Sequence, residues 1–269
     1  MHIGAAIGPR RMKQRRVEED GIALLQRKLD MMRFKMRAAM VPGTWLNEGG
    51  QSAAGAAIDQ LLAFHPHVEA VRKQAESSVQ SLPAWLAQRS EQMLEGNTNA
   101  ARLARGIHVV PEFLGNRAPH ANPHTRAVVA GLGMDLGLKN LVALYIAGIC
   151  GIGYGLRQII AAQTESGAPT KRIVISGGAG RSGLVRQLLA DATGVEIAAP
   201  STEEPVLLGS AILGAVAAKL HPDIPTAMKS MSAFSGFYQP QGGKIAALHE
   251  ARFAIFEQLQ AIARQASRI

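Results

Sequence analysis

The sequence predicts an α/β fold, because short apolar runs typical of strands alternate with segments of helical periodicity. Three observations carry this prediction. Runs such as 172–176 end in glycine turns, apolar residues then recur at spacings of three and four, and 47% of the 269 residues are hydrophobic. A chain of this length and composition can bury a sizeable core, so we expect a globular protein.

The first predicted elements surround a glycine turn. Proline and glycine punctuate a strand-and-turn region over 41–51. From Ser52 the apolar residues follow helical spacing, which predicts a helix with Ser52 as its candidate N-cap. Residues 68–105 predict further helices, interrupted near Pro83, and 107–110 predict an apolar strand.

A long loop rich in Pro, Asn, Gly and His follows this strand and leads to another strand-like run near 127–130. Loops of this length usually serve binding. His120 and His124 are four residues apart, but Pro119 and Pro123 exclude a helix that would present both rings on one face. We therefore predict no metal site there.

The second half of the chain continues the alternation. Residues 139–166 predict a long helix that is apolar on nearly all sides and hence buried, and Cys150 is expected to pack in the core. Its uncharged stretch is shorter than the ~20 residues of a membrane span. The remaining predictions are a strand at 172–176, a helix at 184–194, a strand at 195–200, a helix at 207–219 and a helix at 247–266.

Positive charge is concentrated at the N-terminus. Residues 1–37 hold ten basic and four acidic residues, which is +6 of the formal net charge of +9. We interpret 1–37 as a basic, poorly ordered arm, and we expect no membrane partner and no nucleic-acid partner for the rest of the chain. RNA or anionic lipid binding by the arm is the alternative. Because no signal peptide is found, the expected location is cytoplasmic.

The segment 178-GAGRSG-183 follows a predicted strand and matches the GxGxxG pattern of dinucleotide-binding loops. That pattern also needs an acid about 20 residues on, at the end of the next strand. Glu196 begins that strand and Glu203 lies beyond its end. Taken alone, the motif is also compatible with an ordinary strand-to-helix turn that binds no ligand. Together with the second glycine turn, 48-EGGQSAAG, it predicts a nucleotide that spans a cleft.

Four blocks of sequence resemble the C-terminal half of the FGGY carbohydrate kinases, in particular pentulose kinases of the D-ribulokinase type. They are 41-VPGTWLNEGGQSAAGAAIDQLL, 110-VPEFLGNRAPHANPHTRAVVAGL, 176-SGGAGRSGLVRQLLADATGVEI and 199-APSTEEPVLLGSAILGAVAA. The resemblance runs in order from about residue 40 to about residue 240. It implies an actin-like ATPase (ribonuclease H-like) lobe, a mixed sheet flanked by helices, over 38–269.

The resemblance also implies ATP with Mg²⁺ as the ligand. Carried over onto this sequence, the nucleotide-binding residues are Gly55, Asp59, Gly177, Gly178, Ala179 and Ser182. The glycine loop and Ser182, where family members often have Asn, would lie against the adenosine. Gly55 would approach the phosphates, and Asp59 faces the same region. Helix N-termini and bare backbone suit phosphate without a lysine.

The sequence departs from the family at two places. Asn122 stands where an Asp is usual, and 1–37 hold no counterpart of the Asp-x-Gly-Thr phosphate loop or of the general base. We therefore assign no catalytic residue. The implied activity is ATP-dependent phosphorylation of a hydroxyl of D-ribulose or a related pentulose, for which an N-terminal lobe must be supplied.

The alternative is a non-catalytic nucleotide-binding or regulatory fragment, or a partner of a separately encoded N-terminal lobe. On this view the arm derives from an upstream frameshift, a misassigned start or a split gene. The sequence leaves homo-oligomer formation open.

Overall fold

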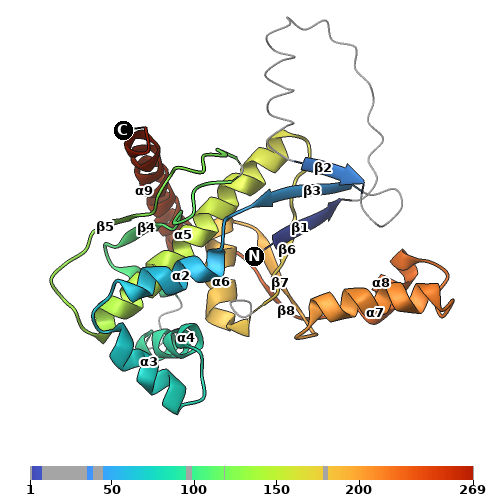
Figure 1. Ribbon diagram of the computed structural model, residues 1–269, viewed down its shortest axis with the longest axis horizontal. Helices are drawn as coiled ribbons and strands as arrows, with labels where there is room; N and C mark the ends of the chain where they lie inside the picture. Colours follow the sequence, from blue (N-terminus) through green and yellow to red (C-terminus); the bar gives the residue numbers. More distant parts are fainter. Residues whose placement is uncertain are drawn as a thin grey trace, which may run out of the picture.

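The computed structural model describes residues 2–7, 35–38, 45–94, 99–117, 119–177 and 181–268 (Figure 1). It confirms the predicted α/β class. The strands are β1 (His2–Ile7), β2 (Lys35–Ala38), β3 (Trp45–Gly50), β4 (His108–Val110), β5 (Val128–Ala130), β6 (Arg172–Val174), β7 (Glu196–Pro200) and β8 (Phe234–Tyr238). The helices are α2 (Ala54–Ala63), α3 (Val68–Ser77), α4 (Leu82–Met93), η1 (Ala100–Ala104), α5 (Leu138–Glu165), α6 (Gly183–Thr193), α7 (Pro205–Ala217), α8 (Ile224–Met231) and α9 (Lys244–Ala266).

The strands form two larger sheets and one short ribbon. In one sheet β3 lies between β1 and β2 and is antiparallel to both. In the other, β7 pairs in parallel with β6, with Ile173 opposite Ile197, and antiparallel with β8. Strands β4 and β5 form the ribbon. Because β1 also contacts β6, the two larger sheets lie next to each other, as Figure 1 shows.

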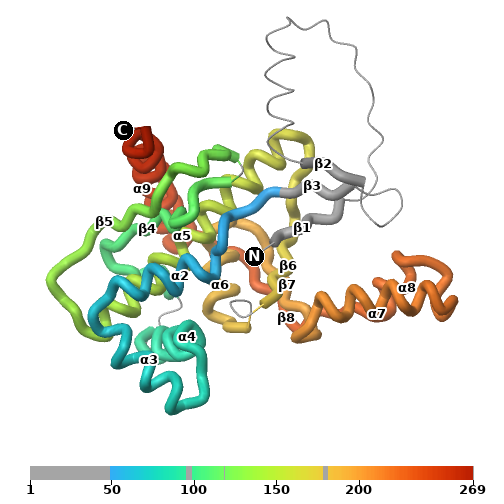
Figure 2. The backbone as a smooth tube through the Cα atoms, in the orientation of Figure 1, coloured from blue at the N-terminus to red at the C-terminus, as the bar shows by residue number. Residues whose placement is uncertain are grey.

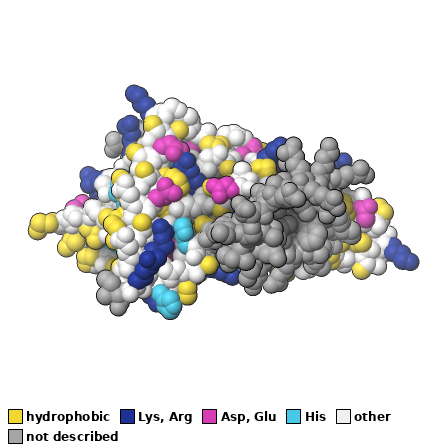
Figure 3. Space-filling model, turned by 90° about the horizontal axis from the view of Figure 1, so that it is seen from above, with side chains coloured by type: hydrophobic (Ala, Val, Ile, Leu, Met, Phe, Trp, Pro, Cys, Tyr) yellow, Lys and Arg dark blue, Asp and Glu magenta, His cyan; other side chains and the backbone are white. Residues whose placement is uncertain are grey.

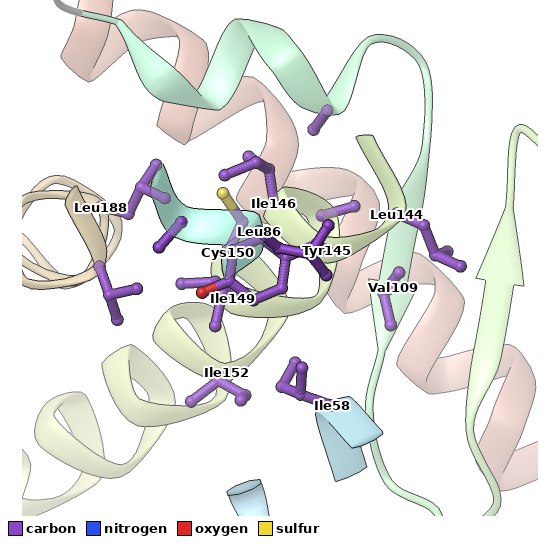
Figure 4. Close-up of a cluster of buried hydrophobic side chains, with 14 of the residues drawn as sticks. Ile58, Leu86, Val109, Leu144, Tyr145, Ile146, Ile149, Cys150, Ile152 and Leu188 are labelled. Atoms are coloured by element: carbon purple, nitrogen blue, oxygen red, sulfur yellow. The ribbon is translucent and has the colours of Figure 1, made fainter. Parts of the chain in front are cut away.

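The long helix α5 is the centre of the core, as its all-round apolar sequence predicted. It contacts α2, α6, β4 and η1. Figure 4 shows its side chains beside Ile58 of α2, Val109 of β4 and Leu188 of α6. By length and composition α5 could cross a membrane, but 78% of its apolar window is buried inside the protein. Cys150 is fully buried, and burial raises the pKa of its thiol to about 11. The prediction that it packs in the core is confirmed.

Two predictions about the first half need correction or stay open. The N-cap of α2 is Ala53, with φ +52°, and not Ser52, because the chain needs one more residue to turn from β3 into the helix. Of the arm, 2–7 and 35–37 belong to β1 and β2, while 8–34 lie outside the described residues. The arm and the domain boundary at residue 38 therefore stay predictions.

Helices α7 and α8 lie side by side, away from the body of the protein (Figure 2). In α7 only Ile212 is buried, although the helix is apolar throughout. Helix α8 and strand β8 were not predicted from the sequence. Both have signals, since the Asp223 side chain caps the first turn of α8 and β8 is rich in aromatic residues.

A buried polar contact joins α5 to α9. The Tyr154 hydroxyl lies 3.0 Å from His249 Nδ1, and His249 is only 1% exposed. Burial, assisted by the positive charges of Arg252 and Arg157, lowers the pKa of His249 from 6.5 to about 4. The imidazole is therefore neutral in the folded protein at pH 5, whereas it is mostly protonated in the unfolded chain.

This shift predicts a loss of stability in acid. Because the unfolded state binds the extra proton, the contribution of His249 falls as the pH decreases from 6.5 towards 4, by about 2 kcal/mol at pH 5. Urea unfolding at pH 7.5 and pH 5 should show that His249→Gln loses less stability than the unaltered protein over this range. Equal losses in the two proteins would contradict the assignment.

Candidate functional site

One large cavity, of about 1250 Å³, lies among α2, the α3–α4 turn, α5 and α6. We call it the α2–α6 cavity. Gly55, Asp59, Gly177 and Ser182, four of the six predicted nucleotide-binding residues, line it. The other two, Gly178 and Ala179, lie outside the described residues, between Gly177 and the start of α6. The two glycine turns therefore both lie at the α2–α6 cavity.

The N-terminus of α2 forms one wall of the cavity. The turn before it is anchored to α5, because Gln51 Nε2 donates a hydrogen bond to the Ile152 carbonyl at 2.7 Å. A side chain at Gly155 would collide with Gln51, so this glycine makes the anchor feasible. Among the described residues, none occupies the space where a Cβ of Gly55 would stand, and no side chain caps the helix. The first backbone N–H groups of α2 are therefore available to an anion.

The N-terminus of α6 forms the facing wall. Gly177 has φ +91°, a conformation that favours glycine, and lies at the end of the loop after β6. Ser182 is the N-cap of α6, and its Oγ accepts a hydrogen bond from Val185 N at 3.3 Å. The cap uses the hydroxyl as an acceptor, and in the part of the chain that the structure describes its O–H has no acceptor, so it can donate to a ligand.

Asp59 supplies a carboxylate to the cavity from the second turn of α2, and it is exposed. Exposed carboxylates of this kind can hold Mg²⁺ jointly with phosphate oxygens, because Mg²⁺ is usually bound by one or two carboxylates and the substrate. Among the described residues, no group of three His, Cys, Asp or Glu side chains is close enough to hold a metal ion alone.

The acids that a dinucleotide would require are engaged elsewhere. Glu196 accepts hydrogen bonds from Arg172 and Gln239, which tie together the three strands β6, β7 and β8. The bond from Arg172 is the main cause of the lowered pKa of Glu196. Glu203 pairs with Arg181 at 3.5 Å and lines a separate cavity of about 270 Å³. Neither acid lines the α2–α6 cavity. The GxGxxG segment therefore lacks the acidic residue that a dinucleotide-binding site would place beside the ribose.

The predicted binding loop after β4 is connected by hydrogen bonds to the end of α9. Asn122 Nδ2 donates to Ser267 Oγ at 3.3 Å, and Asn122 Oδ1 accepts from His124 N at 2.9 Å. Asn122 therefore links the loop to the end of α9 and does not line the α2–α6 cavity. The turn at Pro119–Pro123 is non-helical, as predicted.

Sequence reasoning missed the third wall of the cavity, which the α3–α4 helical insertion provides. Arg72, Glu76, Val79, Gln80 and Gln88 all line the cavity from this side. The segment was predicted as helices with mixed surface charge, and nothing in its spacing indicates that it faces the glycine turns. Figure 3 likewise shows basic and acidic side chains interspersed on the described part of one face.

Comparison with known proteins identifies relatives that match most of this chain. A family model for the C-terminal domain of the FGGY family of carbohydrate kinases matches residues 23–218. An FGGY carbohydrate kinase domain-containing protein of Danio rerio is 35% identical over 222 residues, which cover 82% of this chain and 41% of the relative. A D-ribulokinase of Saccharomyces cerevisiae is 33% identical over 186 residues, 68% of this chain and 26% of that protein.

The fold is likewise found among solved structures. A ligand-bound xylulose kinase from Lactobacillus acidophilus superposes with a TM-score of 0.62 at 20% identity, over 86% of this chain and 42% of that one. This likeness confirms the expected actin-like lobe, a mixed sheet flanked by helices. The chain spans less than half of the length of these relatives.

Proposed function

Because the chain belongs to the FGGY family of carbohydrate kinases, of the pentulose-kinase type, we propose that residues 38–269 bind ATP in the α2–α6 cavity. The observation that carries this proposal is the meeting of two helix N-termini, at Gly55 and Ser182, around one cavity, with open space in the described structure at Gly55. The N-terminus of α2 offers unpaired N–H groups and a positive dipole end, which together suit the phosphates of ATP.

We propose for these residues the roles that the family resemblance implies, four of which belong to residues that line the cavity. Gly55 lets the phosphates approach the backbone of α2, and Asp59 holds Mg²⁺ next to them. Mg²⁺ would supply charge neutralisation on the phosphates. Gly177, Gly178, Ala179 and Ser182 hold the adenosine at the α6 end. The proposed location is cytoplasmic.

The proposed reaction is transfer of the ATP γ-phosphoryl group to a hydroxyl of D-ribulose or a related pentulose. Phosphoryl transfer requires groups on both sides of an in-line attack. The chain spans 41% of its Danio rerio relative, and residues 1–37 hold no counterpart of the family's phosphate loop or general base. We therefore propose that catalysis requires an N-terminal lobe in addition to residues 38–269.

Nucleotide binding is the first measurement. Isothermal titration of the purified chain with ADP should give saturable binding that strengthens when MgCl₂ is present, because Asp59 and the phosphates share the ion. Asp59→Asn should reduce the effect of MgCl₂ and leave binding without magnesium largely intact. If the folded chain does not bind ADP or ATP, the proposal is wrong.

The same protein distinguishes the kinase from its alternative, a non-catalytic nucleotide-binding fragment. Because the chain spans only 41% of its Danio rerio relative, both the kinase and the non-catalytic fragment should be tested. A coupled assay should detect pentulose-dependent ADP release when the N-terminal half of the yeast D-ribulokinase is added, and none from the chain alone. Nucleotide binding with no release for D-ribulose, D-xylulose or L-ribulose under either condition would favour the fragment.

A further inference from the structure

The turn between α3 and α4 has an unusual shape at the wall of the α2–α6 cavity. Val79 has φ +54°, a conformation rarely adopted by a β-branched residue, and its side chain is 95% exposed. Backbone hydrogen bonds hold the turn, among them those from Ser78 N and Gln80 N to the Ala75 carbonyl, at 3.0 and 2.9 Å. The turn therefore presents an apolar side chain to the cavity and places Gln80 directly after it.

The Gln80 amide is held in one direction and is only half satisfied. Its Nε2 donates to Gln88 Oε1 of α4 at 3.2 Å, and both residues line the cavity. Its Oε1 is covered and has no donor in the part of the chain that the structure describes. A covered amide oxygen without a donor is unfavourable, so this group is well suited to a ligand that brings an N–H.

We propose that Gln80 is a specificity-determining residue, which accepts a hydrogen bond from the exocyclic amino group of adenine while Val79 packs against the ring. This inference rests on the proposed nucleotide site. Adenine carries an amino donor at C6, whereas hypoxanthine and guanine carry a carbonyl acceptor there. Two acceptors facing each other repel, so the pair Gln80–Gln88 selects adenine nucleotides over those with a 6-oxo base.

The test compares ADP with inosine diphosphate, in which a 6-oxo acceptor replaces the 6-amino donor and N1 carries a hydrogen. Titration of the unaltered chain should give ADP binding that is about 3- to 10-fold tighter than inosine diphosphate binding, the range of one hydrogen bond. Gln80→Leu should remove this preference, because it weakens ADP binding and relieves the repulsion of the 6-oxo group. Gln80→Glu, which keeps an acceptor towards the base, should retain it. Gln74→Leu, on the exposed side of α3 and outside the cavity, is the matched control.

The outcomes separate the two proposals. If neither diphosphate binds the unaltered chain, the nucleotide site itself is wrong. If both bind equally, or if inosine diphosphate binds more tightly, the amide faces the base with its NH₂ group or not at all, and the inference is overturned. Retention of the preference in Gln80→Leu would overturn it as well. If a variant fails to fold, the unaltered chain still tests the inference, because equal binding of the two diphosphates would overturn it.

Discussion

Gly55→Glu is expected to raise the dissociation constant of ADP at least tenfold, a loss of about 1.4 kcal/mol. Gly55 lies in the first turn of α2 and lines the α2–α6 cavity, with open space where a Cβ would stand. A carboxylate there would place a negative charge where the phosphates approach the helix N-terminus. Helix α2 itself tolerates an acid in its first turn, so folding should be preserved. Isothermal titration and thermal unfolding measure the two effects separately.

Ala56→Glu is the matched control, because Ala56 is the next residue of the same turn, is exposed and does not line the cavity. It adds the same charge to the same helix end but turns it towards solvent. Its effect on ADP affinity should be less than about threefold and should disappear at high salt. If the two variants weaken ADP to the same extent, a general charge effect explains the result and Gly55 has no special place at the phosphates.

The candidate site could be predicted in part because its residues have local signals. A glycine turn between a strand and a helix fixes where backbone N–H groups are bare, and both turns were found in this way, at Gly55 and Gly177. The resemblance to a known family then identified which turns belong to one ligand. The α3–α4 wall has no such signal. Gln80 lines the cavity only because α4 packs against α5 and α6, which are long-range contacts that neither periodicity nor composition reports.

The fold, too, could be predicted only where a feature has a local signal in the sequence. The burial of α5 follows from its apolar sequence, but the reason for its glycines does not. Gly148, Gly151 and Gly153 face α2, β4 and α6 respectively, so each marks a different close approach. Strand β8 was missed because it is antiparallel to β7, beyond a helical pair that the alternation of strands and helices does not foresee. These features depend on which elements become neighbours.

The close approach of α5 to β4 leads to the largest expected effect on stability. A methyl group at Gly151 would collide with the Val109 carbonyl oxygen, which is backbone and cannot rotate away. The strand cannot easily withdraw, because Val109 pairs with Val129 and Arg252 donates to the neighbouring Ile107 carbonyl at 2.6 Å. Gly151→Ala should therefore destabilise the protein by about 1–3 kcal/mol, although alanine is the better helix former. Urea unfolding at pH 7.5 measures the difference.

Two further glycine variants show that the loss comes from rigid backbone and not from alanine. At Gly148 the nearest atoms are the side-chain ends Leu61 Cδ2 and Ile58 Cδ1, at 2.7 and 2.8 Å, which can shift, so Gly148→Ala should cost less. At Gly209, on the exposed helix α7, nothing lies within 4 Å, and Gly209→Ala should cause no loss. A Gly151→Ala protein as stable as these two would mean that α5 and β4 are farther apart in solution. The expected ranking, with Gly151 the most sensitive, would instead mean that the contact with β4 restricts the position of α5 most strongly. The position of α5 in turn matters for the site, because Gln51 anchors the turn before α2 to the Ile152 carbonyl of α5.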